Sequence, residues 1–152
     1  MRIYIARHGD ALSVTEDPER SLSESGKKQV AHVAAVLETI GAAVDRMVHS
    51  GKPRARQTAE ILARSVMREP ELETARDLNP MDPVEPWASR AVELEQDTML
   101  VGHLPFMSRL LTKLVTGAAD PGLVDFPPAT VACLERTREG KWLIVTVVRP
   151  GL

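Results

Sequence analysis

The sequence predicts an α/β fold: a single three-layer domain with a mostly parallel sheet and helices on both faces. Short apolar, β-branched runs alternate with segments of helical periodicity up to about residue 116. A strand followed by a helix and another strand forms a unit whose strands lie parallel. The 152 residues match the length of one domain, and no repeat or linker divides them. We therefore expect one domain over residues 1–152.

Five apolar stretches predict the strands of this sheet. Several are rich in valine and isoleucine, which favour strands, and turn residues separate the last two. Those turn residues are Arg138, Glu139 and Gly140, and they predict a hairpin that ends the sheet. The five stretches are residues 2–6, 44–48, 98–101, 130–134 and 142–148.

Three segments repeat apolar residues at the i, i+3, i+4 and i+7 spacing of helices that bury one face. The first segment has Ser23 as a candidate N-cap and Gly41 just after its end. The second has Pro53 in its first turn, and the third lies between Pro105 and Gly117. The apolar stripes are residues 30–40, 55–66 and 106–114. Two segments rich in glycine or proline, residues 76–86 and 117–128, predict surface loops.

The charge balance excludes several classes of protein. The chain has 19 lysines and arginines against 21 aspartates and glutamates, a net charge of −2. This balance argues against a nucleic-acid binder and against attachment to a membrane through basic residues. The apolar run at the N-terminus is too short for a signal peptide, and residues 142–148 are far short of the ~20 residues that span a bilayer. We expect a cytoplasmic protein and, because no apolar stripe is left unused, a monomer.

Cysteine usage gives no sign of a disulfide or a metal. The single cysteine, Cys133, has no partner within the chain, and no cysteine and histidine have the spacing of zinc ligands. The sequence therefore predicts neither a metal site nor a cofactor.

Polar residues follow three of the predicted strands. Because the carboxyl ends of parallel strands meet at one edge of a sheet, where helix N-termini also point, we expect these residues to form one anion site. They are Arg7, His8, Gly9 and Asp10 after the first strand, His49, Ser50, Gly51 and Arg54 after the second, and Gly102 and His103 after the third.

These residue types suit phosphoryl transfer. Arginine offers a fixed fork of donors that matches phosphate oxygens and stays charged. A neutral imidazole can attack phosphorus when its other nitrogen is held, and nearby guanidinium groups keep it neutral. We expect Gly9 to let the backbone approach the phosphoryl group. Arginines and a second histidine could neutralise the developing charge without a metal.

The residues alone leave several choices open. His32 lies on a helix flank, where we expect it at the surface. His49 and Ser50 alternate, so only one of them points inward, and we expect that one to be Ser50. Arg54 and Arg56 begin the same helix, and either could simply be a solvated charge.

The ordered motifs resemble those of the histidine phosphatase superfamily over essentially the whole chain. A narrower similarity is to its small bacterial phosphohistidine phosphatases, the SixA subfamily. The superfamily motifs are Arg7-His8-Gly9, Ser50-x-x-x-Arg54-Ala55-x-Gln57-Thr58 and Gly102-His103, and the narrower ones are Arg7-His8-Gly9-Asp10-Ala11, Leu22-Ser23-x-x-Gly26 and His103-Leu104-Pro105.

This resemblance implies roles for individual residues. His8 would be the nucleophile that becomes phosphorylated, and water would then release inorganic phosphate. The family's arginine directly precedes the alanine of its Arg-Ala pair, which selects Arg54 over Arg56. His8 and His103 would be the catalytic histidines. Arg7, Arg54 and His103 would hold the phosphoryl oxygens, with the backbone near Gly9 and Leu104 assisting.

One departure from the family pattern bears on the substrate. Many members that cleave phosphate esters supply a carboxylic acid after a Leu-Asn pair, whereas here Leu78-Asn79 is followed by Pro80. An alkoxide leaving group needs an acid, which is worth typically ~10²–10⁴-fold in rate, and a histidine leaving group needs less help. The departure predicts a phosphohistidine-containing signalling or phosphotransfer protein as substrate, admitted by modest loops around an open site.

Two alternatives stay open at this point. Asp77 or Asp82, in the same loop, could supply the acid, which would make the protein a phosphatase of small esters such as sugar phosphates. A module that binds phosphate or phosphohistidine without turnover is the second alternative, and the intact Arg-His-Gly argues against it.

Overall fold

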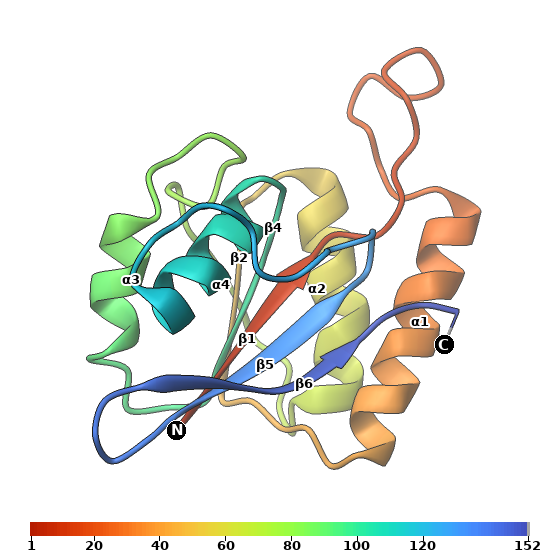
Figure 1. The fold of residues 1–152 in the computed structure, drawn as a ribbon. Helices are drawn as coiled ribbons and strands as arrows, with labels where there is room; N and C mark the ends of the chain where they lie inside the picture. Colours follow the sequence, from red (N-terminus) through yellow and green to blue (C-terminus); the bar gives the residue numbers. More distant parts are fainter. Residues whose placement is uncertain (152) are drawn as a thin grey trace.

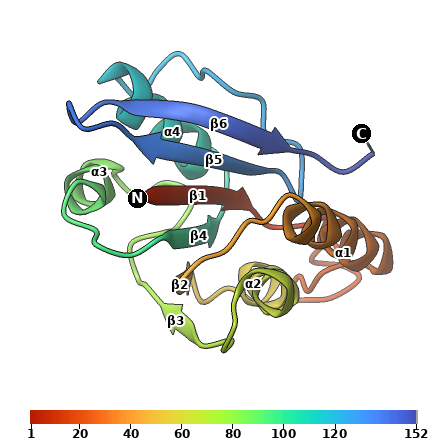
Figure 2. The ribbon, with the colours of Figure 1, turned by 90° about the horizontal axis from the view of Figure 1, so that it is seen from below.

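The computed structural model describes residues 1–151 and shows a six-stranded sheet between two layers of helices (Figures 1 and 2). The strand order is β3-β2-β4-β1-β5-β6. The first four strands in that order are parallel, and β5 and β6 form an antiparallel hairpin beside β1. The predicted three-layer, mostly parallel architecture is confirmed. The strands are β1 (Arg2–Arg7), β2 (Arg46–His49), β3 (Leu72–Thr74), β4 (Thr98–Gly102), β5 (Val131–Arg136) and β6 (Trp142–Val148).

Two helices cover each face of the sheet (Figure 2). Tyr4 and Ala6 of β1 face the core under α1 and α2, and Ile3 and Ile5 face the core under α3 and α4. Because β1 is central and buried on both faces, its sequence is a continuous apolar run rather than an alternating one. The helices are α1 (Glu24–Thr39), α2 (Pro53–Val66), α3 (Glu85–Ala91) and α4 (Phe106–Thr116).

The ends of α1 follow the predicted signals. The Ser23 hydroxyl accepts a hydrogen bond from the Gly26 amide at 3.0 Å, as an N-cap does. After the helix, Gly41 has a φ of 78°, a conformation that glycine adopts without the cost of a Cβ. The chain therefore enters and leaves α1 at fixed positions.

Two elements were not predicted. Strand β3 has only three residues and lies at the sheet edge. Helix α3 begins inside the segment 76–86, which was predicted to be entirely loop. Pro86 is compatible with the helix because it lies in the first turn, where proline needs no amide hydrogen bond. Trp87 anchors this helix in the core with 4% of its surface exposed. Within residues 1–151, no helix has the length and apolarity needed to cross a bilayer.

Candidate active site

The carboxyl ends of β1, β4 and β2 lie side by side and bring His8, His103 and Ser50 together. The His8 amide donates to the Gly102 carbonyl at 2.9 Å, which joins the ends of β1 and β4. The centroids of the His8 and His103 rings are 5.0 Å apart. The predicted convergence of strand ends at one edge is thus present, although β2 and β1 are separated by β4.

His8 is a buried, neutral imidazole with a defined orientation. Its Nδ1 lies 2.6 Å from the Gly9 carbonyl oxygen, so Nδ1 carries the hydrogen and Nε2 keeps a free lone pair. Burial is the main reason that the pKa of His8 falls to about 4, and the charges of Arg54, Arg7 and Arg20 lower it further. At neutral pH this ring is uncharged, the form in which imidazole attacks phosphorus.

His103 is also neutral. Burial, followed by the charges of His8 and Arg54, lowers its pKa to about 3. Its Nε2 lies 2.7 Å from the Ser50 Oγ, and its Nδ1 is buried without a partner among the described residues. The prediction that Ser50 rather than His49 points into this edge is confirmed, since His49 Nδ1 instead accepts from the Gly51 amide.

The two arginines at this edge have no carboxylate partner within residues 1–151. Arg7 donates from Nη1 to the Phe126 carbonyl at 2.8 Å. The Nε atoms of Arg7 and Arg54 are buried without a hydrogen bond in the described structure, and burial lowers the pKa of both groups. Buried donors of this kind need an acceptor, and an anion with several oxygens would supply one.

The helices that begin at this edge add positive potential. Neither α2 nor α4 has a side-chain cap at its N-terminus or an acidic residue in its first turn. Helix α1, in contrast, has the Ser23 cap and Glu24 in its first turn. An uncapped N-terminus presents free amides and the positive end of the helix dipole, so α2 and α4 favour an anion at this edge.

Two side chains of the α2 motif bind the chain that follows His8. Thr58 accepts a hydrogen bond from the Gly9 amide at 3.0 Å and donates to the Arg54 carbonyl at 2.8 Å. Gln57 accepts from the Leu22 amide at 2.7 Å and so holds the loop between β1 and α1. Ala55, which precedes both residues, is fully buried. The motif thus ties the start of α2 to the chain that follows His8.

Gly9 has close contacts within the protein itself, and its part in the approach of a phosphoryl group stays a prediction. Its amide is already bonded to Thr58, so it is not free for a phosphoryl oxygen. A Cβ at Gly9 would lie 2.6 Å from Val30 Cγ2 and 3.1 Å from the Gly26 carbonyl oxygen. Glycine is required there because α1 packs directly against the backbone. Leu104 lies just before α4, whose N-cap residue is Pro105, and its part in holding a substrate stays a prediction.

Arg20 adds a positive charge near this site that its sequence position did not signal. It lies in the loop between β1 and α1, which stands out from the body in Figure 1. Its Nε donates to the Leu12 carbonyl at 3.1 Å, and its φ of 51° is left-handed. Its charge contributes to the lowered pKa values of His8, His103 and Arg54. No periodicity in this loop could have signalled where Arg20 would lie.

The structure separates the remaining candidates. Arg56 is exposed and lies 3.7 Å from Glu60, whereas Arg54 is partly buried and without an ion pair in the described chain. His32 is exposed on α1, as expected. The geometry therefore favours Arg54 at this edge.

Both candidate acids are already engaged. One oxygen of Asp77 accepts from the Trp87 indole at 2.8 Å, and the other pairs with Arg90. Arg90 holds the pKa of Asp77 below its usual range, which makes Asp77 a poor proton donor. Asp82 accepts from the Asn79 amide at 2.9 Å within its own loop.

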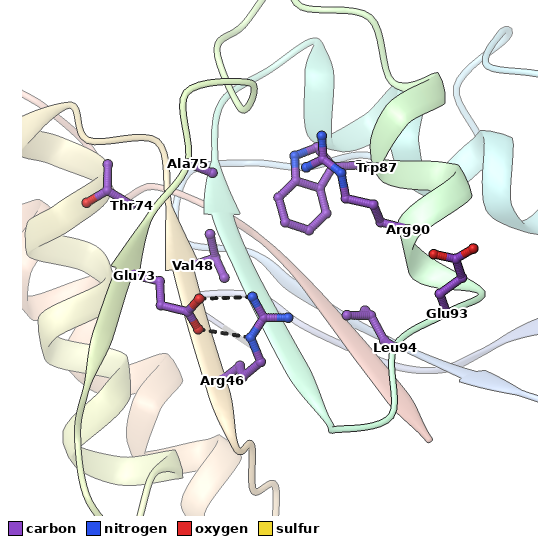
Figure 3. Close-up of a pocket in the computed structure, with 9 residues that line it drawn as sticks. All are labelled: Arg46, Val48, Glu73, Thr74, Ala75, Trp87, Arg90, Glu93 and Leu94. Atoms are coloured by element: carbon purple, nitrogen blue, oxygen red, sulfur yellow. Dashed lines mark hydrogen bonds and ion pairs between the residues drawn. The ribbon is translucent and has the colours of Figure 1, made fainter.

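A pocket of about 380 Å³ lies away from this edge, between α3 and the strands β2 and β3 (Figure 3). Two of its charged side chains, Arg46 and Glu73, are paired with each other. Arg46 makes two hydrogen bonds of 2.9 Å to Glu73, and Arg90 stacks on Trp87 while it pairs with Asp77. No group of three potential metal ligands is present in the described part of the chain.

The sequence profile of the histidine phosphatase superfamily (branch 1) matches residues 3–85, which include β1, His8 and the α2 motif. The chain belongs to the histidine phosphatase superfamily. The solved structure of the protein histidine phosphatase SixA complexed with tungstate superposes with a TM-score of 0.85 at 24% identity, covering 99% of this chain and 97% of that one. The putative phosphohistidine phosphatase SixA from Agrobacterium tumefaciens gives 0.79 at 25% identity, covering 98% and 97%.

A curated relative shares part of this sequence. The mitochondrial serine/threonine-protein phosphatase Pgam5 of Drosophila ananassae is 29% identical over 103 residues, 62% of this chain. The match spans only 36% of that relative's length. The chain therefore spans about a third of that relative's length in this match.

Proposed function

We propose that this protein is a phosphatase that removes phosphate from phosphohistidine in another protein, such as a signalling or phosphotransfer protein, through a phosphohistidine intermediate on His8. One observation carries the proposal. A neutral, oriented His8 lies among buried arginine and histidine donors that have no partner in the described chain. A phosphoryl group would satisfy those donors, and inorganic phosphate would be the product.

In the first step, His8 Nε2 attacks the phosphorus atom of the substrate. A bond forms between Nε2 and phosphorus as the bond between phosphorus and the substrate histidine breaks. The leaving nitrogen keeps the electron pair, and its ring departs as neutral imidazole because the other ring nitrogen carries a proton. The Gly9 carbonyl, 2.6 Å from Nδ1, stabilises the positive charge that develops on the His8 ring.

Arg7, Arg54 and His103 hold the phosphoryl oxygens during this transfer. Phosphoryl transfer depends mainly on positioning and on stabilising the charge of the equatorial oxygens. Guanidinium groups and the N-termini of α2 and α4 supply fixed positive potential at that point. The chemistry of these donors suffices without a metal or a cofactor.

In the second step, water attacks the phosphorus atom of phospho-His8. The bond between phosphorus and Nε2 breaks, inorganic phosphate leaves with the water oxygen and its protons, and His8 returns to the neutral form. Burial favours this return because it disfavours a charged His8 ring.

The engaged carboxylates support phosphohistidine over an alcohol ester. An alkoxide needs a proton as it leaves. Both oxygens of Asp77 are held, by Trp87 and Arg90, and Asp82 binds its own loop through one oxygen. An imidazole leaving group can carry its proton already. The similarity to structures described as protein histidine phosphatases supports the same substrate class.

The test is phosphate release from a phosphohistidine-carrying protein and from a panel of sugar and serine phosphates. We expect turnover of the phosphohistidine protein alone, and a loss of at least about 10³-fold in the His8→Ala variant. His32→Ala, which changes an exposed histidine, is the matched control and retains activity.

Two other results would replace the proposal. Preference for the esters, abolished by Asp77→Asn or Asp82→Asn, would indicate a phosphatase of small phosphate esters. Binding of phosphate with no turnover of any substrate would indicate a binding module.

A further inference from the structure

Ser50 lies directly after β2 and contacts His103, which follows β4. Its Oγ is 2.7 Å from His103 Nε2, and both residues are buried. The sequence motif contains this serine, but the proposed mechanism gives it no part. The hydrogen bonds of Ser50 indicate that it has a part.

The direction of these hydrogen bonds follows from the atoms that surround the Ser50 hydroxyl. The Lys52 amide, which can only donate, lies 3.4 Å from Oγ. The hydroxyl proton itself needs an acceptor, and within residues 1–151 the only acceptor bonded to Oγ is His103 Nε2. If Nε2 carried a hydrogen, two donors would point at Oγ, and both the hydroxyl proton and the buried Nδ1 lone pair would be unpaired, whereas the other tautomer leaves only Nδ1–H unpaired. Ser50 therefore donates, and the hydrogen of the neutral His103 ring is on Nδ1.

That Nδ1–H is an unused donor. His103 Nδ1 is buried and has no partner in the part of the chain that the structure describes. The same is true of Arg7 Nε and Arg54 Nε at the same edge. Buried donors without an acceptor are rare in folded proteins, and three of them at one edge indicate a ligand with several acceptor atoms.

We propose that Ser50 is a positioning residue that fixes His103 in its Nδ1–H form, so that this N–H donates to the bound phosphoryl group. That the acceptor is a phosphoryl group rests on the proposed function. The Nδ1–H form of His103 does not rest on it, because that form is a property of the ligand-free protein.

Without the hydroxyl, the His103 ring loses its only side-chain hydrogen bond in the described structure. The backbone stays in place, because the His103 carbonyl accepts from the Met107 amide at 2.9 Å. The hydrogen of the ring can then move to Nε2. In that form Nδ1 has a lone pair instead of a hydrogen, and it would repel a phosphoryl oxygen rather than bind it. Loss of a residue that orients a metal-ligating histidine typically costs about 10–100-fold in affinity or activity, and we expect a loss of the same order here.

The experiment is ¹⁵N NMR of histidine-labelled protein, with long-range ¹H–¹⁵N correlations that report the tautomer of each ring. The chain has four histidines, so each signal can be assigned from single His→Ala variants. We expect His103 in the Nδ1–H form in the ligand-free protein between pH 6 and 8. Added inorganic phosphate should shift its Nδ1–H signal.

Three variants isolate the hydroxyl. Ser50→Ala should shift His103 toward the Nε2–H form and lower kcat about 10–100-fold. Ser50→Thr, which keeps a hydroxyl, should restore the tautomer and at least part of the activity. Thr98→Val removes a buried hydroxyl from the opposite end of β4, where it donates to the Gln96 carbonyl, and should change neither readout.

The outcomes separate this proposal from the proposed function. An Nε2–H form of His103 in the unaltered protein, or an Nδ1–H form that persists in Ser50→Ala, would overturn the role of Ser50. If the tautomer responds as expected but phosphohistidine is not hydrolysed, the role of Ser50 stands and the proposed substrate is wrong.

Discussion

Two regions of this molecule contain pairs of arginines, and they differ in what surrounds the guanidinium groups. In the pocket beside α3, Arg46 is paired with Glu73 (Figure 3). Arg90, on the same pocket, is paired with Asp77. At the edge formed by β1, β4 and β2, Arg7 and Arg54 have no carboxylate partner within residues 1–151, and their Nε atoms are buried without hydrogen bonds. The pocket is a hollow of about 380 Å³ that contains an ion pair, and the edge offers the unsatisfied charge.

The difference shows which property indicates an anion site. Paired charges already satisfy one another, so an incoming anion would have to displace a carboxylate. Unpaired buried donors gain hydrogen bonds when an anion binds, without losing any protein contact. A hollow is therefore not by itself a sign of an anion site, whereas the unpaired donors at the edge are.

Substitution of one arginine from each region gives the largest contrast. Arg54→Ala should lower kcat/KM about 10²–10³-fold, because it removes a donor to the phosphoryl oxygens. Arg46→Ala should leave kcat/KM within about 2-fold and cost about 0–1 kcal/mol in the free energy of unfolding, since its ion pair is half exposed. Steady-state kinetics and urea denaturation measure both. Equal losses of activity in the two variants would remove the distinction between the regions.

The two regions should also differ in their response to acid. His8 and His103 have pKa values of about 4 and about 3 in the folded protein against 6.5 in the unfolded chain. The unfolded state therefore binds more protons below pH 6.5, and the free energy of unfolding falls as the pH drops from 6.5 toward 4. For His8 alone this amounts to on the order of 3 kcal/mol.

Urea denaturation between pH 4 and 7 tests this prediction. The decline should be smaller in His8→Ala, because one of the two histidines is removed, and unchanged in Arg46→Ala, which alters only the pocket. A decline in His8→Ala as steep as that of the unaltered protein would contradict the assignment to His8. Activity, which needs the neutral ring, should persist to about pH 5.

A smaller effect is expected from Asp77, which lies in the loop of residues 76–86 and pairs with Arg90 of the pocket. Asp77→Asn weakens the contact with Arg90 and should cost about 1 kcal/mol in the free energy of unfolding. Hydrolysis of phosphohistidine should change by less than about 3-fold, because Asp77 is not a proton donor in our account. A loss above about 10-fold, measured by phosphate release, would mean that Asp77 leaves Arg90 during catalysis.

Local sequence signals were enough to predict the layers of the fold and most of its elements. The apolar run of β1 and the stripes of α1, α2 and α4 are long enough to show their periods. Strand β3 has three residues, of which two are exposed, so no alternation could appear. Helix α3 has seven residues and a proline in its first turn, and its stability comes from the burial of Trp87 rather than from periodicity.

Site residues that directly follow strands could be predicted from the sequence. Those that depend on contacts between distant segments could not. His8, Ser50 and His103 follow strands directly, so the parallel order brings them together. Arg20 depends on the path of a non-repetitive loop, which the sequence does not specify. The engagement of Asp77 by Arg90 depends on α3, which was itself not predicted.

The central claim is that His8 receives the phosphoryl group at the edge of the sheet. Rapid acid-free quenching of the protein during turnover of a ³²P-labelled phosphohistidine protein, followed by mapping of the label, tests it most directly. We predict alkali-stable, acid-labile phosphate on His8, absent from His8→Ala and present in Arg46→Ala. Label on another residue, or turnover by His8→Ala, would contradict the account.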